Sequence, residues 1–229
     1  MIDQASDLFR TTFRALARVR GAPAFHPRGV WFEGTVTGVA DSGFPLPSEP
    51  TPVTGRLSKG VGTAGALPDV LGLAIRIPAG PGLDGPWDLA LSSSGGNRVT
   101  RLLPLPARNW TTTRYGSVMP YRWRGRLRWL CADAAPGQPP VASSLPELAA
   151  LLRSRPLEFT LRASTPDGGW QDVAHLSVRT AVAPRDGISF DPVRNGPAGL
   201  EVAPDALRKI REWAYEGSRR GRGARRGES

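Results

Sequence analysis

The chain has too little cysteine and histidine for several common kinds of site. Its 229 residues include one cysteine, Cys131, and two histidines, His26 and His175. A single cysteine excludes a disulfide within the chain, and this set cannot build a zinc site of the usual cysteine and histidine kind. Metal chemistry would therefore have to rest on carboxylates or on a cofactor.

Long hydrophobic runs are also lacking. The sequence contains no stretch of about 18 or more uncharged apolar residues, which is the length that a membrane-spanning helix requires. Residues 1–19 carry Asp3, Asp7 and three arginines, and they contain no apolar core of a secretion signal. We therefore expect a cytoplasmic protein without a transmembrane segment.

Lysine is rare, and arginine supplies most of the positive charge. Lys59 and Lys209 are the only lysines among 30 basic residues, and the formal net charge is +10. Such a charge favours anionic partners that carry phosphate, carboxylate or propionate groups. The arginine-rich end of the chain has no aromatic platform or helix-turn-helix beside it, so we expect no nucleic-acid partner and a disordered basic tail over 223–229.

Glycine and proline are abundant, with 27 and 23 residues. This composition favours short strands joined by turns over a helical bundle. Alternating or apolar stretches of strand length recur along the chain, and they suggest a barrel or a sandwich. We expect strands over 30–37, 52–58, 71–77, 87–91, 98–103, 117–123, 126–132, 157–163 and 170–178.

Three segments have the apolar spacing of helices. Residues 2–19 form an amphipathic pattern that fits either an acidic membrane surface or, more commonly, packing against the protein's own domain. Residues 144–154 have Ser143 or Ser144 as a candidate helix N-cap, and residues 204–218 begin with a proline and an aspartate. The sequence thus predicts helices that flank the strands.

The segment 60–65 spells the glycine pattern of a dinucleotide-binding turn. Pro68 follows too soon for a long helix to open there, so we expect a glycine-rich loop. The chain also lacks the nucleophile elbow, the phosphate-binding loop and the zinc-protease helix motif. Hydrolases and nucleotide-binding proteins with strong signatures are therefore not supported.

An arginine and a tyrosine are four residues apart on the last predicted helix. Arg211 and Tyr215 would lie on one helix face, where the guanidinium can contact the phenol oxygen. Such a contact favours phenolate over phenol, which is the form that binds ferric iron. The pair alone is weak evidence for an iron site.

Three stretches occur in the order typical of one known family. They are Phe25 to Gly29 (FHPRG), Thr51 to Ser58 (TPVTGRLS) and Arg211 to Arg222 (REWAYEGSRRGR), the last of which is preceded by Phe190-Asp191-Pro192. They resemble the distal-histidine segment, the propionate-binding strand and the proximal-tyrosine helix of the haem-dependent catalase-like proteins, especially the small single-domain members. The resemblance covers roughly residues 24–222.

The resemblance implies how haem b would be held. Tyr215 would be the iron ligand, with Arg211 beside its phenolate. Arg56 and Arg222 would pair with the propionates, and Ser218 belongs to the same tyrosine motif.

The resemblance also implies a reaction site on the opposite haem face. His26 would exchange a proton with a small peroxide or hydroperoxide, and Ser58 would orient the imidazole ring. Ser92 stands where the family carries an asparagine that helps to position peroxide. Pro23 replaces an arginine of the family, and polar residues 93–97 replace its aromatic stretch.

We therefore predict an α+β fold, a closed antiparallel β-barrel with flanking helices of the haem-dependent catalase-like kind. A single domain over 1–222 would include the N-terminal helix. The predicted function is haem binding with peroxidase-like chemistry.

Two other functions stay open. Ser92 and the polar 93–97 stretch favour a catalase-fold remnant that binds no haem and serves as a binding module. Residues 57–74 also resemble a group of small actinobacterial proteins, some of which carry an automatic phosphodiesterase label. That label has no support from clustered aspartates and histidines in this sequence. The oligomeric state is open as well, homo-oligomers included.

Overall fold

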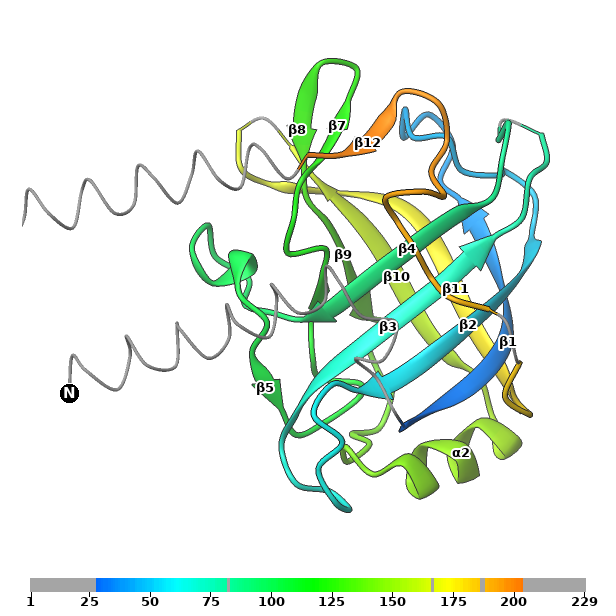
Figure 1. Ribbon diagram of the computed structural model, residues 1–229, viewed down its shortest axis with the longest axis vertical. Coiled ribbons are helices and arrows are strands. Elements are labelled where there is room, and N and C mark those ends of the chain that lie inside the picture. The colour runs from blue at the N-terminus through cyan, green and yellow to red at the C-terminus, as the bar shows by residue number, and fades with distance from the viewer. Residues whose placement is uncertain (1–27, 82, 166, 186–187, 204–229) are drawn as a thin grey trace, which may run out of the picture.

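The computed structural model describes residues 28–203 except 82, 166, 186 and 187. Its central element is a ring of eight strands in the order β2-β1-β11-β10-β9-β6-β4-β3, closed by pairing between β2 and β3. All of these pairings are antiparallel. The predicted closed antiparallel β-barrel is therefore confirmed, and Figure 1 shows it with β2, β3 and β4 toward the viewer.

The barrel strands differ greatly in length. They are β1 (Arg28–Gly38), β2 (Thr51–Lys59), β3 (Asp69–Ile77), β4 (Trp87–Ser93), β6 (Tyr115–Gly116), β9 (Leu130–Ala134), β10 (Leu157–Ser164) and β11 (Trp170–Val182). The short strand β5 (Pro106–Ala107) pairs with the start of β3.

Alternating apolar residues fill the interior of the barrel. In β10, Leu157, Phe159 and Leu161 are buried while the residues between them are partly exposed. Successive side chains of a strand point to opposite faces of the sheet, so this period of two buries one face. Phe32, Leu57 and further apolar side chains from every long barrel strand join the same buried cluster.

The helix predicted over 144–154 is confirmed as α2 (Leu145–Ser154). The Ser144 hydroxyl accepts a hydrogen bond from the Glu147 amide at 3.4 Å, as an N-cap does. Leu148 and Leu152 are buried on one face of the helix. In Figure 1, α2 lies at one end of the barrel and a small second sheet lies at the other.

That second sheet corrects two strand predictions. Only the end of the expected strand 117–123 is a strand, because the chain leaves the barrel at Val118, which has a positive φ of 54°. The expected strand 126–132 is divided at Trp129. Beyond Val118 the chain forms β7 (Tyr121–Trp123) and β8 (Arg126–Arg128), which form a sheet with β12 (Leu200–Val202). Positive φ at both Arg124 and Gly125 gives the two-residue hairpin turn between β7 and β8.

The prediction of a strand over 98–103 was wrong. Residues Thr100–Leu102 form a short 3₁₀ helix, η1. The Asn97 side chain accepts hydrogen bonds from the amides of Val99 and Thr100 at 3.0 and 2.7 Å. This local turn competes with strand pairing for the backbone amides.

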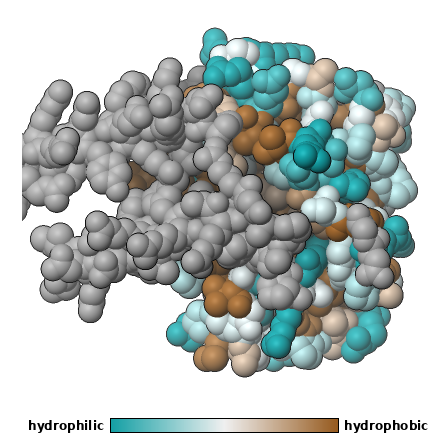
Figure 2. Space-filling model, viewed as in Figure 1, coloured by the Kyte–Doolittle hydropathy of each residue, from teal (hydrophilic) through white to brown (hydrophobic). Residues whose placement is uncertain are grey.

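The remaining predicted elements lie outside the described residues. These are the helices over 2–19 and 204–218 and the tail over 223–229. Within the described part, no helix is long and apolar enough to cross a membrane. In Figure 2, hydrophobic residues appear in small groups among hydrophilic ones on the described surface.

Candidate functional site on the outer barrel face

The outer face of β1 to β6 carries a row of small residues. Directly paired residues of neighbouring strands share a face, and the pairing runs in sequence through five strands. The row consists of Gly29, Ser58, Gly72, Ser92 and Gly116. With strands about 4.8 Å apart, it spans about 19 Å. We call these five residues the small-residue row.

A second row of paired residues lies beside it and includes two alanines. Trp31 pairs with Arg56, Arg56 with Ala74, and Ala74 with Ala90. These residues alternate with interior residues such as Phe32 and Leu57, so they lie on the outer face. We call the two rows together the floor. It follows the curved outer face of the barrel, and Trp31 and Arg56 lie at its border.

Arg56 lies against Trp31 at the border of this floor. The guanidinium carbon is 5.7 Å from the centroid of the indole ring, a cation–π contact. Burial lowers the pKa of Arg56 from its usual value. A guanidinium that has lost part of its water interacts more strongly with an anionic group than an exposed one does.

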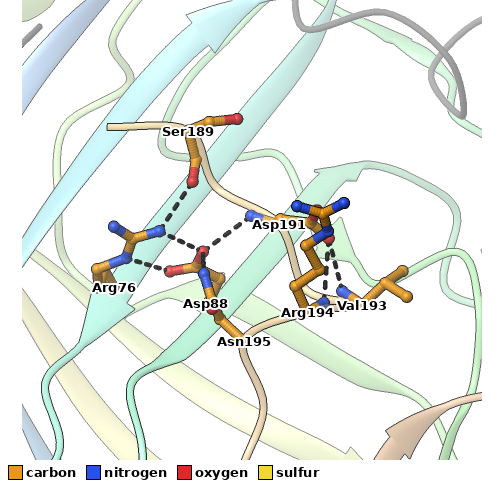
Figure 3. Close-up of polar contacts among 7 residues, drawn as sticks. All are labelled: Arg76, Asp88, Ser189, Asp191, Val193, Arg194 and Asn195. Atoms are coloured by element: carbon orange, nitrogen blue, oxygen red, sulfur yellow. Dashed lines mark hydrogen bonds and ion pairs between the residues drawn. The ribbon is translucent and has the colours of Figure 1, made fainter. Parts of the chain in front are cut away.

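The segment 188–195 is fastened to the outer face beyond this border. Asp88 is fully buried, and Arg76 donates to its two oxygens at 2.7 and 2.6 Å. The Asp191 amide and the Asn195 side chain donate to the same carboxylate at 2.8 and 2.7 Å. Figure 3 shows these contacts, together with the 2.8 Å bond from Arg76 to the Ser189 carbonyl.

This fastening brings an aromatic side chain to the floor. The ring of Phe190 lies 5.6 Å from that of Trp31, with the two planes tilted by 30°. Asp88 and Arg76 thereby determine where segment 188–195 meets the border formed by Trp31. Sequence reasoning did not identify Asp88 and Arg76 as a pair, although it placed both in expected strands and noted the FDP sequence at 190–192. Their pairing depends on the register between β3 and β4, which no local pattern specifies.

Three of the predicted site residues fall on one face of the barrel. Arg56 and Ser58 are two apart on β2, and Ser58 and Ser92 flank Gly72 from opposite sides. Ser58 is buried, whereas Ser92 is partly exposed. The other predicted site residues lie outside the described part of the chain, namely His26, Arg211, Tyr215, Ser218 and Arg222.

Apolar side chains from the long barrel strands pack together in the barrel interior. On the outer face, no side chain of the small-residue row is larger than serine. The side chains of Arg56 and Ser94 lie against its two end glycines, Gly29 and Gly116. Two open cavities of about 310 and 480 Å³ lie elsewhere and share Trp123 in their lining. Neither is lined by Arg56, Ser58 or Ser92.

The glycine-rich segment 60–65 is a structural loop. The Asp69 carboxylate accepts hydrogen bonds from the amides of Val61 and Thr63 at 2.8 and 2.7 Å. The buried Lys59 ammonium donates to the carbonyls of Gly65 and Leu67 at 2.9 and 3.2 Å. These charged groups are used within the loop itself, so the segment does not cradle a phosphate.

Metal-dependent hydrolysis gains nothing from the described residues. Among them, no group of three or more histidine, cysteine, aspartate or glutamate side chains could hold a metal ion. Cys131 is buried at the end of the small-residue row, where it pairs with Gly116. Burial, with a smaller contribution from Asp133, raises the pKa of the Cys131 thiol to about 12, so it is a poor nucleophile.

The comparisons with known proteins identify no family. No protein-family model matches this chain, and no curated protein matches its sequence. The resemblance to catalase-like proteins therefore stays a prediction that rests on the residues quoted above.

Proposed function

We propose that the protein binds haem b against the outer floor of its barrel and handles a small peroxide or hydroperoxide. One observation carries this proposal. Arg56, Ser58 and Ser92, which were singled out from the sequence by their roles, share one face around a row of small residues. Small side chains with a cation at their border and hydroxyls among them suit a planar, doubly anionic ligand.

The chemistry of the floor fits one face of a tetrapyrrole. Glycine, alanine and serine let a planar ring approach the sheet closely, because none carries more than one heavy atom beyond Cβ. Arg56 would meet a propionate in a charge-assisted hydrogen bond, strengthened by the partial burial of the guanidinium. Trp31 holds Arg56 in position through its ring face.

The residues predicted from the terminal segments would complete the haem site. Tyr215 would ligate the iron as a phenolate stabilised by Arg211, and Arg222 would meet the second propionate. Ser218 would lie in the same motif. Bound haem would supply the electrons needed to cleave an oxygen–oxygen bond.

The protein's own groups would move the proton in this reaction. The imidazole of His26 would accept a proton from one peroxide oxygen and return it to the departing oxygen. Ser58 would fix the orientation of the ring. Ser92 has a hydroxyl that can hydrogen-bond the peroxide on the same face, as a shorter group than the asparagine of the family. We therefore expect peroxidase-like rather than full catalase turnover.

Hemin titration of the purified protein tests the proposal. We expect a Soret band that saturates at one haem per chain, disappears in Tyr215→Phe and weakens in Arg56→Gln. Arg153→Gln is the matched control, because Arg153 is an exposed residue of α2 and lies outside the small-residue row. The control should retain the spectrum of the unchanged protein.

A colourless protein would refute the proposal if its circular dichroism shows an intact barrel. That result would favour the binding module that lacks haem. Release of nitrophenol from bis-nitrophenyl phosphate that survives chelators and repurification would instead revive phosphodiester hydrolysis.

A further inference from the structure

Arg101 covers Trp129 on the outer face of the barrel. Trp129 immediately precedes β9 and is two residues before Cys131, so its side chain points to the same outer face. The guanidinium carbon of Arg101, which comes from η1, lies 3.9 Å from the centroid of the indole ring. Trp129 is only 8% exposed.

Both side chains hold a buried donor without an acceptor. Within the described part of the chain, neither Nε1 of Trp129 nor Nε of Arg101 has a hydrogen-bond partner. Buried N–H groups in folded proteins are nearly always paired, because an unmade bond leaves the lost hydration uncompensated. Two such donors in contacting side chains therefore need a common explanation.

The local charge has the same sign as these donors. Burial and the nearby positive charge of Arg98 both lower the pKa of Arg101. The ion pairs found among the described residues do not include Arg101. An acceptor that carries negative charge would satisfy the two N–H groups and offset the repulsion between the two arginines.

Other tryptophans show that stacking or burial alone does not produce this arrangement. Arg124 also stacks on an indole, that of Trp123, at 5.3 Å, but the Trp123 Nε1 donates to the Gly43 carbonyl at 2.8 Å. Trp87 has an unpaired Nε1 inside the apolar core, where no arginine of the described part stacks on it. Among the described residues, only the Trp129 pair combines a buried, unpaired indole Nε1 with an overlying guanidinium.

We propose that Arg101 and Trp129 form a binding site for the carboxylate of a small ligand. A carboxylate has two oxygens, which can accept separately from Nε of Arg101 and Nε1 of Trp129. Arg98 adds charge but is not required to touch the ligand. This site does not depend on haem, and it lies on a different part of the outer face from Arg56.

Acetate is the probe for this site. The full chain, labelled with nitrogen-15, is titrated with sodium acetate against sodium chloride at constant ionic strength. The indole signal of Trp129, assigned through Trp129→Phe, should shift saturably with acetate and not with chloride. The signals of Trp123 and Trp87 should stay where they are, since the first is already bonded and the second lies in the core.

Variants of Arg101 distinguish the site from general charge effects. Arg101→Gln should weaken acetate binding about tenfold or more, because a hydrogen bond to a charged group is lost. Arg101→Lys keeps the charge but removes the planar donor, so it should weaken binding as well. Arg124→Gln, at the stacked pair whose indole is already bonded, should leave binding unchanged. Unaltered Trp123 and Trp87 signals would show that each Arg101 variant is folded.

Two results would overturn the proposal. The first is a Trp129 signal that responds equally to acetate and chloride, or equally in Arg101→Gln. The second is a signal that is already at the bonded position without acetate and does not move, since the acceptor would then come from the chain itself.

Discussion

Two cross-strand ion pairs of arginine and aspartate differ in how far they are exposed on the two sides of this barrel. Arg76 pairs with Asp88 across β3 and β4, and Arg162 pairs with Asp172 across β10 and β11. In both pairs Nε donates to one carboxylate oxygen at 2.7 Å. The exposed fraction of the aspartate side chain is 0% in the first pair and 48% in the second.

The surroundings of the two pairs explain what each does. Asp88 also receives bonds from Asp191 and Asn195, so the first pair fastens another segment to the barrel. Arg162 instead forms a second ion pair with Asp133, which also pairs with Arg114. These residues form a network of ion pairs that is partly exposed to water. The ion pair between β3 and β4 is therefore covered by segment 188–195, whereas the charged side chains of β9 to β11 pair with one another in contact with water.

Removing each aspartate charge tests this comparison with the largest expected effect. Asp88→Asn should lower the free energy of unfolding by about 3 kcal/mol, because it leaves a buried amide facing donors that had paired with a carboxylate. Asp172→Asn should change it by less than about 1 kcal/mol, as expected for an exposed ion pair. Urea denaturation measures both, and equal losses would show that the two sides do not differ as described.

The strands of the barrel were easier to predict from the sequence than the turns and side-chain contacts around them. The long strands β1, β2, β3, β10 and β11 were predicted because their apolar residues are continuous or alternate over seven or more positions. Helix α2 was predicted because its cap and its apolar face agree. The departures occurred at Val118 and Asn97, where a single backbone angle or side-chain turn ends the pairing.

The candidate site was predictable only where residue identity carries the signal. The resemblance singled out Arg56, Ser58 and Ser92, and the register then put them on one face. The stacking of Arg101 on Trp129 had no sequence signal, because 27 residues separate the two and the contact depends on how the loop with η1 folds back. Long-range contacts of this kind follow from the tertiary fold rather than from local pattern.

A larger side chain on the floor should weaken hemin binding, whereas a substitution on the side of β9 to β11 should not. Ala90→Leu places three more carbons on the floor beside the small-residue row, and we expect hemin affinity to fall about tenfold or more, or about 1.4 kcal/mol. The free energy of unfolding should change by less than about 1 kcal/mol, because Ala90 is partly exposed and lies outside the core cluster.

The control for this change is Thr160→Leu, which also presents a leucine on the outer face. Thr160 lies on the outer face of β10, opposite Asp133, on the side where charged side chains pair in contact with water. It should leave hemin binding unaltered. If both substitutions weaken binding equally, or if neither does, the floor is not where hemin binds.

The loop at the end of β2 offers a smaller effect that depends on pH. Burial alone would raise the pKa of Asp69, but hydrogen bonds from Val61 and Thr63 outweigh it and hold the pKa below its usual 3.8. A carboxylate with a depressed pKa in the folded state stabilises the protein above its unfolded pKa, and this contribution is lost as the pH falls through the folded value. At pH 7, Asp69→Asn should therefore lower the free energy of unfolding by about 1 kcal/mol, and the difference from the unchanged protein should shrink below about pH 4.

Urea denaturation at pH 7 and pH 3 measures both differences, with Asp172→Asn as the control for an exposed carboxylate. A constant gap between the Asp69 variant and the unchanged protein would mean that the carboxylate charge does not hold this loop.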